Sequence, residues 1–330
     1  MRRLRAAPVA VLLLFAVLAA CSGAADRPAE DAAGRPTGQT AGTATGPSSG
    51  PSSGPATASP SGPSKGATTG PPGGATNHPT GRPPTGRPPT GPASRPTPTR
   101  WQPRPGVAWQ WQLDGKVDPS VDVPVYDIDG FENSAAAVAR LHRDGRKVIC
   151  YINVGAWEDF RPDRDAFPRS VLGGPNGWHG ERWLDIRRIP VLRPLMERRF
   201  DMCRDKGFDA VEPDLMEGYA NDTGFPLTAD DQLRYNRMIA EIAHERGLAV
   251  GLKNDLAQIP RLVRHFDFAV NEECAEFDEC ALLAPFVAAG KAVFHVEYSE
   301  PTAGFCPEAR ALRLSSMLKN PELDVWRRPC

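Results

Sequence analysis

The chain of 330 residues carries 39 Lys and Arg against 40 Asp and Glu, but the charge is divided unevenly along it. Residues 101–330 hold 29 basic and 37 acidic residues, and such an anionic domain lacks the clustered positive charge that sustained nucleic-acid binding needs. This length is enough for one large domain with a full hydrophobic core, which we expect to be a monomer with a neutral or cationic partner.

The first 20 residues are predicted to form a secretory signal. Arg2, Arg3 and Arg5 precede an apolar run over residues 8–20, which is too short and wrongly flanked for a membrane-spanning helix. Residues 18–21, Leu-Ala-Ala-Cys, are similar to the lipobox of bacterial lipoproteins, in which the cysteine becomes the lipid-bearing first residue. We therefore expect lipidation of Cys21 and an exported domain at the extracellular face of the cell membrane, with no other membrane contact. An ordinary cleaved signal with a secreted product is the alternative.

Residues 22–100 contain 66 Pro, Gly, Ser, Thr or Ala residues among 79 positions. Such a composition buries too little apolar surface to offset the entropy lost on ordering. We predict a disordered linker over residues 21–100, beginning at the lipidated cysteine, and a folded domain over residues 101–330.

Short apolar runs alternate with helical patterns from Trp101 onward. Strands are predicted at residues 107–111, 123–128, 147–153, 209–214, 249–254, 267–271, 292–297 and 314–319, and helices at residues 134–143, 194–206, 230–246 and 279–289. Eight such repeats within a domain of this length predict an α/β fold of the (β/α)8 or TIM-barrel type. A doubly wound open sheet is the alternative, but it would be expected to carry a glycine-rich phosphate loop after its first strand, where the sequence has Trp-Gln-Trp-Gln-Leu.

Polar residues end or follow six of the predicted strands. In a barrel the C-terminal ends of the strands hold the active site, so these side chains are expected to converge. They are Asp127 and Asp129, Asn153, Glu212 and Asp214, Lys253 and Asn254, Glu272 and Glu273, and Glu297. Carboxylates at one barrel mouth suit glycoside hydrolysis, in which one acid protonates the leaving oxygen and another carboxylate attacks carbon or activates water. Asp255 and Asp278 are instead predicted to cap helices.

Six cysteines remain after Cys21, which is an even number and suits an oxidising compartment. Side-chain alternation places Cys150 on the outer face of its strand, so a bridge to Cys203 in the following helix is sterically reasonable. Elimination and closeness in sequence then suggest Cys274 with Cys280, and Cys306 with Cys330. Because six cysteines allow fifteen pairings, this assignment is a hypothesis.

Four segments of the domain resemble those of glycoside hydrolase family 114, the endo-α-1,4-polygalactosaminidases. They are Cys-Tyr-Ile-Asn-Val-Gly-Ala-Trp-Glu-Asp-Phe-Arg at 150–161, Gly-Phe-Asp-Ala-Val-Glu-Pro-Asp at 207–214, Gly-Leu-Lys-Asn-Asp at 251–255 and Asn-Glu-Glu-Cys at 271–274. The likeness runs from about Trp109 to Cys330 and leaves out the linker. It implies a TIM barrel that cleaves α-1,4-linked galactosamine polymers, which occur partly N-acetylated in microbial biofilm matrices.

Carried over by position, the resemblance implies a catalytic pair of Asp214 and Glu272. The arrangement is similar to retaining α-galactosidase barrels, whose nucleophile follows the fourth strand and whose acid/base follows the sixth. By this analogy Asp214 is the nucleophile and Glu272 the general acid/base, and a retaining reaction is expected. Glu273 competes for the second role, because an error of one residue in the strand register would turn its side chain inward instead.

Free galactosamine units carry ammonium groups that an acidic domain attracts, so we expect a cationic polysaccharide as the partner. The candidates for binding it are Asp127, Asp129, Asn153, Trp157, Glu212, Tyr219, Lys253, Asn254, Glu273 and Glu297. Lys253 could also balance the surrounding negative charge or hold Asp214 ionised, and the loop over residues 161–190 is expected to tune substrate choice.

Neither a cofactor nor a catalytic metal is expected, because the six histidines lack the spacing of a zinc site. Two other functions stay open. One is a surface-tethered barrel that binds a polysaccharide without cleaving it, and the other is a hydrolase of a different envelope polysaccharide.

Overall fold

The computed structural model of the chain describes residues 100–330. The predicted signal, the lipidated Cys21 and nearly all of the predicted linker lie outside the described residues. Within residues 100–330, none of the helices is long and apolar enough to cross a membrane.

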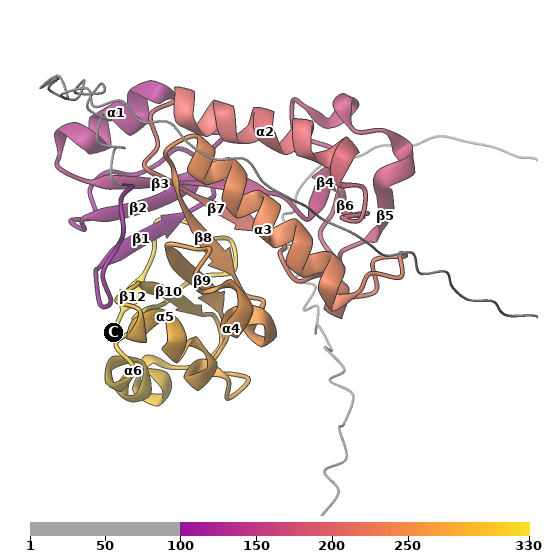
Figure 1. Cartoon of the computed structure of the whole chain (residues 1–330). Coiled ribbons are helices and arrows are strands. Elements are labelled where there is room, and N and C mark those ends of the chain that lie inside the picture. Colours follow the sequence, from indigo (N-terminus) through magenta and orange to yellow (C-terminus); the bar gives the residue numbers. More distant parts are fainter. Residues whose placement is uncertain (1–99) are drawn as a thin grey trace, which may run out of the picture. The chain divides into compact units, whose positions relative to one another are not determined.

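Eight parallel strands form a curled sheet in which each strand pairs with its neighbour in the chain, if the small sheet inserted after the third strand is left aside (Figure 1). They are β1 (Trp109–Gln112), β2 (Val125–Asp129), β3 (Lys147–Asn153), β7 (Ala210–Asp214), β8 (Ala249–Lys253), β9 (Phe268–Glu272), β10 (Val293–Glu297) and β11 (Ser315–Leu318). A short ninth strand, β12 (Arg328–Pro329), pairs antiparallel with β11. All eight predicted strands are confirmed, and the sheet is of the α/β barrel type.

Helices follow six of these strands. They are α1 (Ala135–Arg143), α2 (Ile189–Asp205), α3 (Ala229–Glu245), α4 (Ile259–Leu262), α5 (Ala284–Ala288) and α6 (Thr302–Ala311). The expectation of eight strand–helix repeats is therefore wrong for the first and last strands of the described domain. Between β1 and β2 the chain forms a loop, which the Gln112 side chain holds by donating to the carbonyl oxygens of Asp114 and Lys116 at 3.1 and 3.0 Å.

The predicted helix over residues 279–289 is divided into a 3₁₀ turn (Cys280–Leu283) and α5.

The two aspartates that were expected to cap helices do not do so. Asp255 precedes a 3₁₀ turn with a left-handed backbone and makes no capping hydrogen bond; its carboxylate accepts from Asn236 Nδ2 at 2.8 Å instead. At the turn after Asp278, the cap position belongs to Glu279, whose side chain makes no capping bond either.

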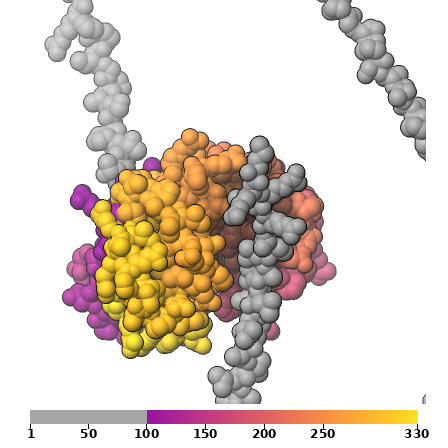
Figure 2. All heavy atoms as spheres, turned by 90° about the horizontal axis from the view of Figure 1, so that it is seen from below, coloured from indigo at the N-terminus to yellow at the C-terminus, as the bar shows by residue number. Residues whose placement is uncertain are grey.

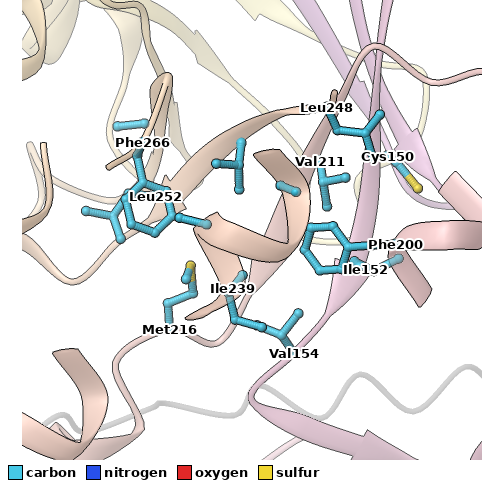
Figure 3. Packing of buried hydrophobic residues seen from close by; sticks show 14 of the residues in the cluster. Cys150, Ile152, Val154, Phe200, Val211, Met216, Ile239, Leu248, Leu252 and Phe266 are labelled. Atoms are coloured by element: carbon cyan, nitrogen blue, oxygen red, sulfur yellow. The ribbon is translucent and has the colours of Figure 1, made fainter. Parts of the chain in front are cut away.

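Apolar side chains alternate between two cores on opposite faces of the curled sheet. The outer core lies between the sheet and the helices, where Ile152 and Val211 meet Phe200 of α2 and Ile239 of α3 (Figure 3). The inner core fills the inside of the curl with the side chains of Trp109, Trp111, Val125, Ile149, Ala210, Ala249, Phe268, Val270, Phe294, Val296 and Met317. The parity of a residue along its strand thus decides whether its side chain faces the inside of the curl.

The C-terminal residues bridge the gap between the first and last parallel strands. The indole Nε1 of Trp109 donates to Ser315 O at 2.7 Å, which joins β1 to β11 directly. Gln110 Nε2 donates to Val325 O at 2.7 Å, and Leu113 N donates to Leu323 O at 3.0 Å. Figure 2 shows these yellow C-terminal residues beside the indigo start of the domain.

The three predicted disulfide bonds are confirmed. Cys150 on β3 is bonded to Cys203 on α2, across the outer core. Cys274 is bonded to Cys280 in the loop after β9. Cys306 on α6 is bonded to Cys330 and thereby ties the C-terminus to the barrel.

A small antiparallel sheet is inserted between β3 and α2, where a substrate-tuning loop was expected. Its strands are β4 (Ala156–Glu158), β5 (Leu172–Pro175) and β6 (Glu181–Leu184), in the order β4-β6-β5. Gly155 begins this insertion where it passes the loop after β7, and a Cβ atom at residue 155 would lie 1.9 Å from Leu215 O. Only glycine therefore allows this close approach.

Candidate active site

Three charged residues end three neighbouring strands. Asp214 is the last residue of β7, Lys253 the last of β8 and Glu272 the last of β9. Each shares its strand parity with inner-core residues, Ala210, Ala249 and Val270 respectively. Because the strands are parallel and adjacent, all three side chains point into the same end of the curled sheet.

The Lys253 ammonium joins the carboxylates. Its Nζ lies 2.9 Å from Glu212 Oε1, 2.9 Å from Asp214 Oδ1 and 3.2 Å from Glu272 Oε2. The side chains of Lys253 and Glu212 are 2 % and 0 % exposed, whereas those of Asp214 and Glu272 are 16 % and 26 % exposed. Of these four groups, only Asp214 and Glu272 present appreciable surface to a ligand.

The charges in this cluster fix two protonation states. Burial alone would lower the pKa of Lys253, but the carboxylates of Asp214, Glu212 and Glu272 raise it well above its ordinary value, so the lysine is a permanent cation. Burial likewise pushes the pKa of Asp214 upward, and the charge and hydrogen bond of Lys253, with a hydrogen bond from Tyr151, bring it below its ordinary value. Asp214 is therefore ionised near neutral pH.

Two tyrosines orient the exposed carboxylates and were missed from the sequence. Tyr151 Oη donates to Asp214 Oδ2 at 2.8 Å, and Tyr298 Oη donates to Glu272 Oε1 at 2.5 Å. Tyr151 could have been found by strand parity, because it lies two residues before Asn153 on the third predicted strand. Tyr298 lies beyond the predicted end of its strand, where the sequence offered no signal.

The backbone turns sharply after each of the three charged residues. Leu215, Asn254 and Glu273 have positive φ angles of 59°, 47° and 62°, which are uncommon for residues other than glycine. Asn254 uses this conformation to hold Glu272 on both sides: Asn254 Oδ1 accepts from Glu272 N at 3.0 Å, and its Nδ2 donates to Glu272 Oε2 at 3.4 Å. Asn254 thus contacts Glu272 directly, and both polar atoms of its side chain take part in these bonds.

Glu273 differs from Glu272 in its surroundings. Its backbone N–H donates to Val296 O at 2.8 Å, and its partly buried carboxyl has a pKa raised to about 7 by burial and by the neighbouring charges of Glu272, Glu276 and Glu297. Glu272 alone of the two is bonded to Lys253.

Three predicted site residues are buried and use their polar atoms within the protein. The Asp129 carboxylate accepts from Arg161 Nη1 and Nη2 at 3.1 and 2.7 Å. Asn153 Oδ1 accepts from the backbone N–H groups of Gly155 and Ala156. Glu297 has the parity of the outer face, and its Oε1 accepts from Ala275 N and contacts His295 Nε2. All three lie at strand ends, as predicted, and these bonds engage the named oxygen atoms within the protein.

Asp127 and Glu212 face the inside of the sheet below Asp214 and are fully buried. They therefore offer no surface to a substrate.

The two predicted aromatic contacts, Trp157 and Tyr219, are partly exposed. Trp157 on β4 donates from its indole Nε1 to Arg164 O at 3.0 Å, and Tyr219 lies in the 3₁₀ turn Gly218–Ala220. Burial and the adjacent Asp255 raise the pKa of Tyr219 to about 12, so its hydroxyl stays neutral.

Two further carboxyl groups stand near Asp214. Glu181 on β6 accepts from Asn176 Nδ2 at 2.8 Å and Asn153 Nδ2 at 3.4 Å, and burial with the charges of Glu158 and Asp214 raises its pKa to about 7. Burial and the charge of Asp214 raise the pKa of Glu217 to about 8. Glu181 belongs to the inserted sheet, whose pairing brings it to Asn153, and no sequence pattern indicated this.

Among the described residues, one group has the proximity of metal ligands, Cys274, Cys280 and His295, with their candidate atoms within 4.8 Å of one another. The two sulfurs are joined in a disulfide bond, and it is the thiolate form of cysteine that binds metals. The His295 ring contacts Ser316 Oγ at 2.8 Å and Glu297 Oε1 at 2.7 Å. This group is therefore part of the outer core.

Comparisons with known proteins point to one family. The sequence pattern of glycoside hydrolase family GH114 matches residues 91–330. The structure of Aspergillus fumigatus Ega3 in complex with galactosamine is 40% identical, with a TM-score of 0.68, and the match covers 70% of this chain and 98% of that one. The glycoside hydrolase domain of PelA from Pseudomonas aeruginosa shares the fold at 14% identity and a TM-score of 0.54, over 67% of this chain and 97% of that one. A search of curated proteins found no match.

Proposed function

Because the chain belongs to glycoside hydrolase family GH114, we propose that it hydrolyses α-1,4-linked galactosamine polymers with Asp214 and Glu272 as its catalytic pair. The observation that carries this proposal is the meeting of both carboxylates at one lysine nitrogen, at the end of the sheet where barrel enzymes hold their active sites. They are also the exposed members of that cluster. The galactosamine bound to the similar Ega3 chain supports the choice of sugar.

The separation of the pair supports a retaining reaction. Asp214 Oδ1 and Glu272 Oε2 lie 2.9 and 3.2 Å from the same nitrogen, so they cannot be farther apart than the two distances combined. That limit is shorter than the roughly 6.5 Å at which inverting pairs begin, while retaining pairs stand about 5 to 5.5 Å apart.

In the first step Asp214 attacks the anomeric carbon as Glu272 gives its proton to the glycosidic oxygen, which leaves with the departing chain. The product is a glycosyl ester of Asp214. In the second step Glu272, now ionised, takes a proton from water while the water oxygen attacks the anomeric carbon and releases Asp214. Lys253 and Tyr151 keep Asp214 ionised for the first step, and Tyr298 and Asn254 hold Glu272 in place for both.

The surroundings of the pair suit a cationic polymer. Three more carboxyl groups lie near Asp214 and Glu272, on Glu181, Glu217 and Glu273. Because their pKa values are raised, a bound ammonium group would shift each carboxyl toward its charged form.

We also propose that the enzyme works outside the cytoplasm, because three disulfide bonds in one domain suit an oxidising compartment.

The test is hydrolysis by the variants Asp214→Asn and Glu272→Gln. Each is expected to lower the release of reducing ends from a de-N-acetylated α-1,4-galactosamine polymer by at least about a thousandfold, because each removes one half of the carboxylate mechanism. Glu276→Gln is the matched control, since Glu276 is an exposed carboxylate four residues from Glu272, and it should retain wild-type activity. Full activity in either of the first two variants would refute the catalytic pair.

Assays of the wild-type protein distinguish the other candidate functions. Binding of the polymer without new reducing ends would identify a polysaccharide-binding barrel. Reducing ends from another envelope polysaccharide only would identify a different substrate. For the proposed retaining reaction, nuclear magnetic resonance of the first product should show the α-anomer, and an initial β-anomer would show inversion.

A further inference from the structure

A carboxyl group without a hydrogen-bond donor lies beneath the catalytic pair. Asp127, in the middle of β2, is 0 % exposed, and neither of its carboxyl oxygens has a hydrogen-bond partner among residues 100–330. An ionised carboxylate in such a place would have lost its hydration without any replacement, at a large cost in free energy.

Glu212 is the neighbouring acid and has one free oxygen of its own. Its Oε1 accepts from Lys253 Nζ at 2.9 Å, while its buried Oε2 has no donor within the described domain. The two acids lie on β2 and β7, which both pair with β3: Asp127 is opposite Ile149, and Glu212 is opposite Tyr151. Their side chains are within hydrogen-bonding reach of each other. Both acids have inward parity, so they face the same small space inside the sheet.

Three buried oxygens without donors thus lie on two adjacent acids. A single proton between the acids would bring two of these oxygens into one hydrogen bond, since a protonated carboxyl is a donor and Glu212 Oε2 is an acceptor. Burial and the mutual charge of the acids raise the pKa of Asp127 well above its ordinary value, and burial also raises the pKa of Glu212. Since Lys253 stabilises the charge on Glu212 and does not contact Asp127, the proton belongs on Asp127.

We propose that Asp127 is a permanently neutral carboxylic acid that donates its proton to Glu212 Oε2, and that this bond sets the position of Lys253 between Asp214 and Glu272. Asp127 is a positioning residue, because it acts on the reacting groups only through Glu212 and Lys253. The proposal rests on the proposed function for the roles of Asp214 and Glu272.

The geometry explains why Lys253 needs this support. Its Nζ contacts three carboxylates and lies 4.8 Å from the centroid of the Trp111 ring, which forms the floor below it. Glu212 accepts one hydrogen bond from the Lys253 ammonium on the inner side. The other N–H groups of Lys253 are then free to point at Asp214 and Glu272. The ionisable groups that act on Asp127 and Glu212 are Asp214, from the same strand as Glu212, and Lys253 from β8. Glu272 from β9 and Tyr151 from β3 act in turn on Lys253.

Three variants test whether the Asp127 carboxyl group is neutral or charged. Asp127→Asn keeps a neutral donor for Glu212, Asp127→Leu fills a similar volume without a donor, and Glu212→Gln removes the anion that faces Lys253. We expect kcat of Asp127→Asn to exceed that of Asp127→Leu at least tenfold. The pH–rate profile of Glu212→Gln should move to lower pH by roughly one unit or more, because its acidic neighbours then lose their protons more readily. The profile of Asp127→Asn should stay within a few tenths of a unit of the wild type, and a displacement equal to that of Glu212→Gln would overturn the proposal.

A second measurement needs neither activity nor folding of the leucine variant. In wild-type protein with ¹³C-labelled aspartate, the Asp127 carboxyl signal is assigned by its loss in Asp127→Asn. It should keep the chemical shift of a neutral carboxylic acid from pH 5 to 8. The shift of an ionised carboxylate in that range would refute the proposal even if the enzyme is active. A neutral signal would support it even if galactosamine polymers prove not to be the substrate.

Discussion

Lys253 is the positive charge that the carboxylates of the site share. A buried cation is normally costly, and here three carboxylates within 3.2 Å of one nitrogen compensate for its burial. The lysine contacts both exposed acids, and their other partners differ: Asp214 receives a hydrogen bond from Tyr151, whereas Glu272 receives hydrogen bonds from Tyr298 and Asn254. Two similar side chains can therefore take different roles.

Replacing Lys253 with methionine should change the protonation of Asp214. Because Lys253 lowers the pKa of Asp214, its loss should raise that pKa, and the acidic limb of the pH profile for kcat/KM should move to higher pH. We expect at least a hundredfold loss of kcat/KM at neutral pH and a lower melting temperature, since Glu212 and Asp214 lose their counter-charge. Lys147→Met, at a largely exposed lysine paired with Asp209, is the control and should preserve the profile. An unmoved acidic limb in Lys253→Met would contradict this account of Asp214.

At the scale of secondary-structure elements, a buried ion network joins the inserted sheet to the barrel. Arg199 on α2 donates to Asn153 O at the end of β3 and to Glu158 Oε2 on β4, and it forms a two-bond pair with Asp163. Glu158 in turn pairs with Arg161, which holds Asp129 on β2. Two arginines thereby connect two barrel strands, a helix and the insertion.

Removing one partner from such a network leaves buried charges without compensation. Arg199→Ala is expected to lower the free energy of unfolding by about 3 to 5 kcal/mol, measured by urea denaturation. Arg193→Ala on the same helix is the matched control, because its partners Glu241 and Glu245 are exposed and Glu197 is partly exposed, and it should cost no more than about 1 kcal/mol. Equal losses in the two variants would show that the network does not stabilise the fold.

At the scale of the whole molecule, buried acids make the stability depend on pH. Burial raises the pKa of Asp255 to about 8, although hydrogen bonds from Tyr219 and Asn236 oppose the change. An unfolded aspartate titrates near 3.9, so between about pH 4 and 8 the folded state holds a proton that the unfolded state has lost. The contribution of Asp255 is therefore most favourable at low pH and is lost as pH rises toward 8. Glu217, with its pKa raised to about 8, acts in the same direction.

The free energy of unfolding should accordingly fall between pH 5 and 8, by at most about 1.4 kcal/mol per pH unit for each such group. Asp255→Asn keeps an uncharged acceptor for Asn236 and should make this decline shallower than in the wild type. Asp278→Asn, at an exposed aspartate, should run parallel to the wild type. Denaturation curves at four pH values measure these slopes, and parallel lines for Asp255→Asn would show that its carboxyl is not held neutral.

The sequence by itself determined the eight parallel strands, the main helices between them and the position of the acidic pair along the chain. Strand periodicity and the helix patterns identified all eight parallel strands, because burial of alternate residues is imposed locally by the pleat of the backbone. Strand-end polarity drew attention to Asp214, Lys253 and Glu272, and the four matching segments indicated the family. The disulfide pairs of the structure are those that side-chain parity and closeness in sequence had suggested.

Only the tertiary structure decided which polar groups are free to act. Asp129, Asn153 and Glu297 end strands as Asp214 does, yet their partners come from an inserted sheet, a turn and the outer core. Tyr298 and Glu181 reach the site through packing between segments far apart in the chain, and the C-terminal residues join β1 to the opposite edge of the sheet in the same way. Residue type and periodicity are local properties, whereas hydrogen-bond partners, burial and pKa depend on which distant segments the fold brings together.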